Sequence, residues 1–395
     1  MSIKGSKRFT SLSSRLTSKI QEHSEESFPP DAHKTLRKFA MREAADFLRI
    51  NQNTFRHYVS TLADKIPTGE LDKSNRRYFT LEEIHQIQEV LFREGKIEAK
   101  DHPRRSSTER CQVITCFNLK GGSAKTSTVV NTAQLMAARG YRVLLVELDS
   151  QASLTNMFGI TPELDPDMLT SYDMIRYKDP VPAREVIRRT YFPGIDLIPG
   201  SMNIMEFEFE TALSFRNPGA SGVFHTRIAA ALEAVQKDYD IILFDTPPQL
   251  SFAVIAALFA SNGVLIPLNA SMLDVMSLAS FLRMAGELMT VVETYAPDHG
   301  FDFVKILITR YEAGDQPQVQ MASFLRTVLG PTVMPVEFVK STAIGDAANT
   351  KQTVFEVEPR EINRKTYDRV IESISRICDE IEIEMHKSWG RTDGA

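Results

Sequence analysis

The stretch Asn-Leu-Lys-Gly-Gly-Ser-Ala-Lys-Thr-Ser at residues 118–127 constrains the fold of this chain more than any other feature. It follows an apolar run at residues 113–117 and precedes a helical pattern from Thr128 to Arg139. A strand, a glycine pair and Lys-Thr at the start of a helix are the layout of a phosphate-binding loop, where backbone N–H groups and a helix N-terminus face the anion. The sequence therefore predicts a nucleotide-binding α/β domain.

Each part of this loop has a chemical reason. Gly121 and Gly122 let the backbone approach phosphates closely and adopt conformations that other residues avoid. Lys125 supplies a positive charge to the β- and γ-phosphates, and the Thr126 hydroxyl is a ligand type for the Mg²⁺ that bridges them. The alternative is a Gly-rich strand-to-helix turn with two solvated lysines.

The loop departs from the ordinary pattern G-x-x-x-x-G-K-[ST], because Leu119 and Ala124 occupy the positions of its two glycines. A second lysine, Lys120, stands five residues before Lys125. The segment resembles the deviant P-loop of the ParA/MinD branch of P-loop ATPases. The resemblance implies that Lys120 contacts the phosphates of a partner protomer in a nucleotide-sandwich dimer. It also implies nucleotide contacts by Lys120, Gly121, Gly122, Ser123, Ala124, Lys125, Thr126 and Ser127.

Two acidic segments follow buried strands. The apolar run 143–147 leads to Asp149, in a segment similar to the family's Asp-x-Asp-Pro-Gln switch, with Glu147 in place of the first acid and Ser150 in place of the proline. The run 240–244 leads to Asp245 in Asp-Thr-Pro-Pro, at the end of a strand where α/β sheets bind ligands. The resemblance implies that Asp149 positions the attacking water. Asp245, together with Thr126, is expected to hold Mg²⁺.

Further strands are predicted at 195–200, 263–267, 304–309 and 333–336, alternating with helices at 251–260, 274–295 and 319–329. This alternation predicts a mostly parallel sheet with helices on both faces. Val333–Val336 resembles the family's last strand and loop, whose backbone lies near the adenine, so Pro335 and Val336 are expected to contact the nucleotide. Residues 161–215, which contain six prolines, give no functional prediction.

Residues 36–98 have the pattern of a small DNA-binding domain, either all-helical or winged. Apolar residues at helical spacing between Leu36 and Leu48 predict one helix, and residues 52–61 predict a second after a break, as in a helix-turn-helix. A basic turn at 73–79 and a capping box at Thr80–Glu83 follow. The side chains expected to contact DNA are Gln52, Asn53, Arg56, His57, Arg76 and Arg77, which are types that bind base edges and phosphates.

The remaining segments complete the domain division. Residues 1–35 are an N-terminal arm in which 12–20 form either a short amphipathic helix or part of a disordered tail, and residues 99–110 are expected to link the DNA-binding domain to an ATPase domain at 111–395. The first 110 residues carry 21 Lys and Arg against 16 Asp and Glu, whereas the whole chain has 46 against 51. DNA contact is therefore expected mainly at the front.

Three other features exclude classes of protein. The three cysteines have no metal or disulfide spacing, and the sequence shows neither an export signal nor a membrane span. The last helical pattern, from Arg360 to Lys387, is acidic outside its apolar stripe, so we expect it to pack on the body rather than on anionic lipid. Scattered cations, Arg310, Lys340, Lys351, Arg364 and Lys365, are candidates for a DNA-binding face of the body.

Taken together, the motifs resemble the ParA family of partition ATPases, and the front domain narrows the resemblance to larger members such as the RepA partition proteins of repABC plasmids. The resemblance implies a slow ATPase that uses ATP and Mg²⁺, forms an ATP-dependent homodimer and coats nucleoid DNA without sequence preference in the cytoplasm. A centromere-binding protein of the ParB or RepB type would stimulate hydrolysis, and the front domain would repress the partition operon.

Three alternatives stay open at this point. In the first, the chain is a transcriptional repressor whose body binds nucleotide only as a signal, which a measurement of ATP turnover would test. A MinD-like positioning ATPase requires a lipid-seeking segment. A reductase of the nitrogenase iron protein type requires cluster cysteines, and Cys111 and Cys116 lie within one apolar strand instead.

Overall fold

The computed structural model describes residues 5–27, 34–165, 167–215, 224–293, 296–344, 351–360 and 362–391. Its contacts divide the chain into two compact units, Met1–Thr35 and Leu36–Ala395. The first unit contains α1 (Gly5–Ser27), so residues 12–20, for which the sequence leaves both a helix and a disordered tail open, lie within a longer helix that leaves Phe9, Leu12 and Leu16 exposed. The boundary between residues 36–98 and 111–395 lies inside the second unit and stays a prediction.

The front region, residues 36–98, folds into a small antiparallel sheet and three helices. The sheet order is β1-β3-β2, and the hairpin of β2 and β3 stands where the winged version of the predicted fold requires a wing. The elements are β1 (Phe39–Ala40), α2 (Met41–Phe47), α3 (Gln52–Thr61), β2 (Glu70–Leu71), β3 (Arg77–Phe79) and α4 (Leu81–Arg93).

One helical prediction is wrong at its start. Phe39 and Ala40 fit the helical spacing of the residues after them, but they form strand β1, which pairs with Phe79 and Tyr78. The reason is local: Ala40 is extended, and its N–H donates to the Glu43 carboxylate at 3.0 Å, so the helix begins only at Met41. Phe39 is fully buried in strand β1, and a helix would also place an apolar residue inside, so its apolar character alone did not distinguish strand from helix.

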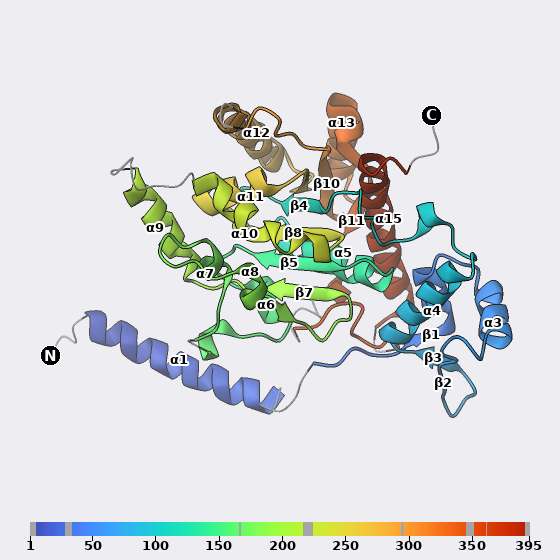
Figure 1. The fold of residues 1–395 in the computed structure, drawn as a ribbon. Coiled ribbons are helices and arrows are strands. Elements are labelled where there is room, and N and C mark those ends of the chain that lie inside the picture. The colour runs from blue at the N-terminus through green and yellow to red at the C-terminus, as the bar shows by residue number, and fades with distance from the viewer. Residues whose placement is uncertain are drawn as a thin grey trace. The chain divides into compact units, whose positions relative to one another are not determined.

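The body is built on an eight-stranded sheet of order β11-β10-β9-β4-β8-β5-β7-β6, and β4, β8, β5 and β7 lie one below another in Figure 1. Each neighbouring pair is parallel except β6 with β7. The strands are β4 (Gln112–Cys116), β5 (Val143–Glu147), β6 (Arg188–Arg189), β7 (Ile195–Ile198), β8 (Ile241–Asp245), β9 (Gly263–Asn269), β10 (Phe303–Tyr311) and β11 (Val333–Val339).

Helices cover both faces of this sheet, as predicted. One apolar core joins alternate strand residues to α5 and α15, and two others join the opposite residues to α7, α10, α11, α12 and α13. The helices of the body are α5 (Lys125–Ala138), α6 (Ser153–Met157), α7 (Ser171–Ile175), α8 (Ala183–Val186), α9 (Ile204–Ser214), α10 (Arg227–Glu233), α11 (Phe252–Ala260), α12 (Met272–Glu293), α13 (Gln316–Leu329) and α15 (Arg364–Ser388).

The last helix packs on the body, as expected from its apolar stripe. Val370, Ile374, Ile377, Ile381 and Met385 are buried, and α15 lies against α5 and β11. The helix begins at Arg364, because the Asn363 side chain accepts hydrogen bonds from the backbone N–H groups of Lys365 and Thr366. In the part of the chain that the structure describes, no helix is both long enough and apolar enough to cross a bilayer.

The front region and the body share one apolar core. Phe39, Phe55 and Leu91 of the front belong to the same cluster as Val130 of α5 and Ile377 of α15. The connecting residues 99–110 are irregular after a short 3-10 turn, Ala99–Asp101. The Arg105 guanidinium holds them against the body by donating to the carbonyls of Tyr239 at 2.8 Å and Gln236 at 3.0 Å.

Candidate nucleotide site

The backbone between β4 and α5 follows the path of a phosphate-binding loop. Gly122 has φ +74° and Ala124, the residue before the helix, has φ +67°. Two side chains at the end of β10 hold this path: the Thr309 hydroxyl donates to the Ser123 carbonyl at 3.0 Å, and the Arg310 guanidinium donates to the Gly122 carbonyl at 3.1 Å. Gly121 and Gly122 are exposed, so their backbone N–H groups are open to a ligand.

Lys125 is the first residue of α5 and is 7% exposed. Its ammonium donates to the Lys120 carbonyl at 3.4 Å. Burial lowers the pKa of Lys125, against the attraction of Cys116, Asp245 and Asp149. A cation held at a helix N-terminus, with one protein acceptor at the limit of hydrogen-bond distance, suits a phosphate ligand.

Thr126 and Asp245 meet as predicted. The Thr126 hydroxyl donates to Asp245 Oδ2 at 2.7 Å, and the Asp245 carboxyl group is fully buried at the end of β8. Burial raises the pKa of Asp245 to about 7. Asp245 Oδ1 is buried and has no hydrogen-bond partner among the described residues. This free carboxylate oxygen beside a hydroxyl fits Mg²⁺, which takes one or two protein oxygens and keeps its other positions for water and phosphate.

Sheet register brings three residues to the same edge. Cys116 of β4 and Glu147 of β5 both stand opposite Asp245 of β8. The Glu147 carboxylate is fully buried and accepts from the backbone N–H groups of Leu154 at 2.9 Å and Thr155 at 2.7 Å, at the start of α6. Burial, with a further contribution from Asp245, raises the pKa of Glu147 to about 8. Glu147 therefore anchors the turn that carries the switch aspartate.

Asp149 lies in that turn, between Glu147 and α6. Its side chain accepts from the Gln151 N–H at 3.0 Å, and its carbonyl accepts from the Ala152 N–H at 3.1 Å, with Ala152 at φ +50°. Asp149 acts electrostatically on both Lys125 and Asp245. The structure thus brings the switch acid, the loop lysine and the strand-end carboxyl group to one site.

Lys120 lies at this site but is paired within its own chain. Its ammonium is 2.7 Å from Asp274 Oδ1, and the two side chains are 41% and 3% exposed. Asp274 lies in the first turn of α12, where the Ser271 hydroxyl donates to its other oxygen. The sequence analysis did not find Asp274, which is more than 150 residues away in a helix with no motif.

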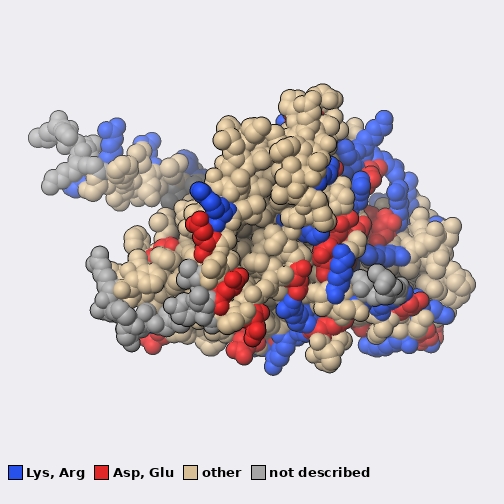
Figure 2. Space-filling view, turned by 90° about the horizontal axis from the view of Figure 1, so that it is seen from above, with Lys and Arg blue, Asp and Glu red and all other residues tan. Residues whose placement is uncertain are grey.

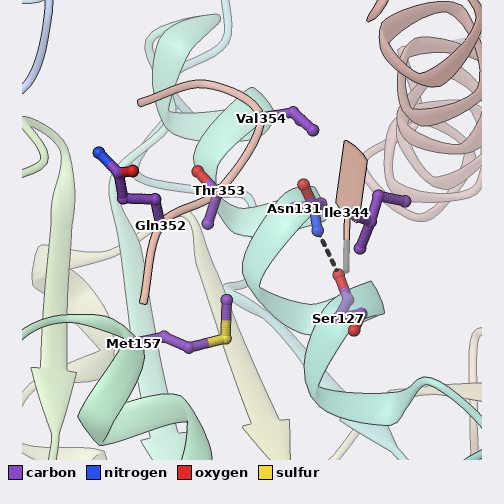
Figure 3. A pocket seen from close by; sticks show the side chains of 7 residues that line it. All are labelled: Ser127, Asn131, Met157, Ile344, Gln352, Thr353 and Val354. Carbon is purple, nitrogen blue, oxygen red and sulfur yellow. Dashed lines mark hydrogen bonds between the residues drawn. The ribbon is translucent and has the colours of Figure 1, made fainter. Parts of the chain in front are cut away.

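A small pocket adjoins the first turn of α5. Ser127 and Asn131 of α5 line one side of it in Figure 3, and the Asn131 amide donates to the Ser127 carbonyl at 2.8 Å. The pocket is lined by Ser127, Asn131, Met157, Ile344, Gln352, Thr353 and Val354. Of the residues predicted to bind nucleotide, Ser127 is the one that faces this pocket.

Pro335 and Val336 do not lie in a loop. They lie within strand β11, which continues to Val339, and Val336 is 4% exposed in the apolar core. The expected end of the strand at residue 336 is wrong, because Val336 and Phe338 alternate with more exposed residues and extend the pairing with β10. Contact of these two residues with the nucleotide stays a prediction that their position does not support.

The side chains predicted to contact DNA lie on α3 and on the β2–β3 hairpin, and each is exposed or half-buried. Asn53, Arg56 and His57 are exposed on α3, and Gln52 is half-buried at its start. The Arg56 guanidinium donates to Asn53 Oδ1 at 3.1 Å. Arg76 is exposed in the β2–β3 hairpin, and Arg77 in β3 donates to the Thr68 carbonyl.

Three of the cations proposed for a DNA face of the body, Arg310, Lys340 and Arg364, lie next to acceptors of the protein itself. Arg310 contacts the phosphate loop, as described above, and Lys340 pairs with Glu312 at 2.8 Å. Arg364 lies 3.7 Å from Asp368 in the first turns of α15. Among these cations, Arg310 is therefore part of the nucleotide site instead.

The chain is similar in sequence to known proteins. The model of the AAA domain family matches residues 111–294. The protein named "Putative replication protein A" of Sinorhizobium fredii (strain NBRC 101917 / NGR234) is 39% identical over 380 residues, which cover 95% of this chain and 93% of the relative. The "Chromosome partitioning protein ParA" of Caulobacter vibrioides (strain NA1000 / CB15N) is 26% identical over 243 residues, covering 61% and 85%.

The fold is also similar to that of a solved structure titled "Partition Protein". The two superpose with a TM-score of 0.66 and 16% identity, covering 96% of this chain and 99% of the other. This likeness extends over the front region as well as the body. The relatives above, together with the P-loop geometry, show that the chain belongs to the ParA family of plasmid partition ATPases, a family of P-loop proteins that bind ATP with Mg²⁺.

Proposed function

We propose that this chain is a DNA-segregation ATPase whose ATP-bound homodimer binds DNA without sequence preference and whose front region recognises an operator. The observation that carries the proposal is the pair of lysines at one phosphate loop. Lys125 is fixed at the start of α5, whereas Lys120 is partly exposed and held by one ion pair that it can leave. A lysine so placed is available to the phosphates of a second protomer.

Each residue of the nucleotide site has its own role in ATP hydrolysis. Lys125 and the backbone of residues 121–124 bind the phosphates, and Thr126 with Asp245 holds the Mg²⁺, which neutralises charge on the transferring phosphoryl group. Asp149 orients the attacking water. The partner protomer's Lys120 adds a cation where negative charge develops. None of the site residues named here is assigned the role of a strong base, so slow turnover that a centromere-binding protein accelerates is the expected behaviour.

The test is a DNA-binding titration with ATP, ADP or no nucleotide, on random DNA and on DNA from the chain's own operon. We expect binding to random DNA only with ATP, and binding to operator DNA through the front region under conditions where random DNA is not bound. ATP turnover is then measured with DNA and the centromere-binding partner. Equal binding of random DNA in all three nucleotide states contradicts the proposal.

A second candidate is a repressor whose nucleotide acts only as a signal. It is favoured by the contacts between α4 and the end of the P-loop helix: His85 Nε2 lies 2.7 Å from the Ala137 carbonyl, and the Gln88 amide donates to the Arg139 carbonyl at 2.8 Å. These contacts join the nucleotide helix to the front region. Nucleotide-dependent operator binding without ATP turnover, even with DNA and partner present, would favour this candidate.

A further inference from the structure

The helix α9 carries an exposed apolar row that the body does not cover. Met205, Phe209 and Leu213 are 45%, 61% and 58% exposed and recur every four residues, so they lie along one side of the helix. Met202, in the turn before the helix, is 65% exposed. Exposed apolar side chains gathered in a row mark an interaction surface more often than scattered ones do. We call Met202, Met205, Phe209 and Leu213 the α9 row.

The charge beside this row has one sign. Glu206, Glu208 and Glu210 are the charged residues of α9, and the helix has no Lys or Arg. The Glu206 carboxylate is exposed beside the apolar row, whereas the Glu210 carboxylate accepts from the Tyr172 hydroxyl at 3.2 Å and the Tyr177 N–H at 3.3 Å and is half-buried. Two copies of α9 packed face to face would bring two acidic helices and their Glu206 carboxylates together, which disfavours a second copy of α9 as the occupant. The charge instead suits a helix with Lys and Arg beside its apolar side chains.

The helix is also connected to both acidic segments of the nucleotide site. The Glu208 carboxylate accepts from the backbone N–H groups of Phe252 at 2.8 Å and Ala253 at 3.0 Å, which begin the helix after the Asp245 loop. Before α9, the Gly200 N–H donates to the Thr155 hydroxyl at 2.9 Å, and Thr155 in turn donates to Glu147. Figure 1 shows α9 at the edge of the body beside α7 and α11, which agrees with its contacts.

We propose that the α9 row is the docking site of the centromere-binding partner, which contributes an amphipathic helix with apolar residues at spacings of three and four flanked by Lys and Arg. This inference rests on the proposed function. A helix docked here displaces α9, and α9 is hydrogen-bonded to the start of α11 and, through Gly200 and Thr155, to Glu147. The partner thereby adjusts the positions of Asp149 and Asp245 and stimulates hydrolysis without contacting the nucleotide.

Variants at this row test the proposal. Phe209→Ser and Met205→Ser with Phe209→Ser are compared with the wild type for binding of the purified partner by calorimetry and for partner-stimulated ATP turnover. We expect the partner's dissociation constant and its half-maximal stimulating concentration to rise about tenfold or more, because truncation of a central apolar anchor has effects of this size. Basal turnover and ATP-dependent DNA binding should not change.

The matched control is Phe324→Ser on α13. Phe324 is 52% exposed, and its replacement makes the same chemical change on another helix, so partner binding and stimulation should stay as in the wild type. Glu206→Lys should weaken binding and reduce its salt dependence, because it replaces an attractive charge with a repulsive one. Equal partner binding by wild type and the Met205/Phe209 double variant overturns the docking site.

A photo-reactive phenylalanine at position 209 identifies the occupant. We expect an ATP-bound mixture with the partner to give a cross-link to a partner segment of the stated pattern. A cross-link to a second copy of this chain, including its residues 5–27, overturns the proposal. If the wild type binds the partner without stimulation, the proposed function fails while the docking site is still judged by the binding of the variants. If the wild type does not bind the partner at all, both fail.

Discussion

Lys120, the lysine expected to act on a second protomer, is held by Asp274 of its own chain at 2.7 Å. Asp274 is almost fully buried, and Ser271 binds its second oxygen, so the carboxylate is fixed while the lysine is the movable partner. Any contact of Lys120 with a second protomer's phosphates first requires this ion pair to break. The pair therefore opposes dimer formation until a stronger anion is offered.

Replacing Asp274 with Asn removes this opposition without changing the size of the side chain. We expect the ATP concentration for half-maximal dimer formation to fall by up to about fivefold, because the partner lysine is partly exposed and such a pair contributes at most about 1 kcal/mol. Analytical ultracentrifugation across an ATP series measures this. The double variant Asp274→Asn with Lys120→Ala should not dimerise, which separates release of the lysine from a general loosening of α12.

Replacement of Lys125 and replacement of Lys120 should impair different steps. Lys125→Gln removes the cation fixed at the helix N-terminus, so nucleotide affinity should fall about tenfold to a hundredfold. Lys120→Gln should leave the affinity of the monomer for nucleotide near that of the wild type and abolish ATP-dependent DNA binding. Fluorescent nucleotide titration and DNA mobility shift distinguish the two. Normal ATP-dependent DNA binding by both variants would reject the phosphate contacts.

The central fold was predictable because its strands are buried on both faces. The runs that became β5 and β8 are uninterrupted apolar stretches that end in an acid, and chain order places such ends at one edge of a parallel sheet. The meeting of Thr126 with Asp245 followed from that rule. Lys125 and Thr126 open α5, as the loop pattern predicted, whereas the predicted start of α15 was four residues early, because capping sets the start of that helix.

Other parts of the site depend on contacts that a local pattern does not contain. Asp274 is an ordinary helix-start acid in sequence, and only the fold brings it to Lys120. In sequence, Arg310 is one of several scattered cations, and only the fold shows that it lies at the end of β10 and donates to the Gly122 carbonyl. The edge strand Arg188–Arg189 has two residues, too few for any period to show. The exposed row on α9 lies in residues 161–215, for which the sequence offers no functional prediction.

Ala124 should be a site where glycine stabilises the protein. Its φ of +67° places an L-residue in the left-handed region, which costs about 1–2 kcal/mol. Glycine removes this cost, but its larger conformational entropy in the unfolded chain offsets part of the gain. Ala124→Gly should therefore raise the free energy of unfolding by about 0.5–1 kcal/mol, measured by the shift in thermal midpoint. Ala138→Gly at the other end of α5 is the control and should lower stability by about 1 kcal/mol.

The buried carboxyl of Asp245 predicts a pH dependence of Mg²⁺-dependent nucleotide binding. Its pKa is raised to about 7, so the proton must leave before the oxygen can accept a metal ion. Affinity for Mg-ATP should fall about fivefold from pH 7 to pH 6 and level off above pH 8. Asp245→Asn reports the titration of the nucleotide itself, and an identical pH profile in wild type and variant would remove Asp245 from the metal site.

The Asp245 carboxyl group should also make the stability of the protein depend on pH, with stability falling as pH rises whereas Mg-ATP affinity rises. A carboxyl whose pKa is raised on folding binds more protons in the folded chain than in the unfolded chain between about pH 4 and pH 7. The stability of the nucleotide-free protein should therefore decrease as pH rises through this window and then stay constant with respect to this group. Asp245→Asn should show a smaller decrease, which urea unfolding at pH 5 and pH 8 will measure.

Arg56 is the residue of the front region whose removal should best separate base reading from phosphate binding. It is exposed on α3 and oriented by the hydrogen bond to Asn53 Oδ1, which leaves its other guanidinium nitrogens available. Arg56→Ala should weaken operator binding by about 1–3 kcal/mol and change binding to random DNA little. Arg76→Ala, in the hairpin, should weaken both and reduce the salt slope by about one. Unchanged operator affinity in Arg56→Ala would exclude base reading by this side chain, and an equal loss on both DNAs would make it a phosphate contact.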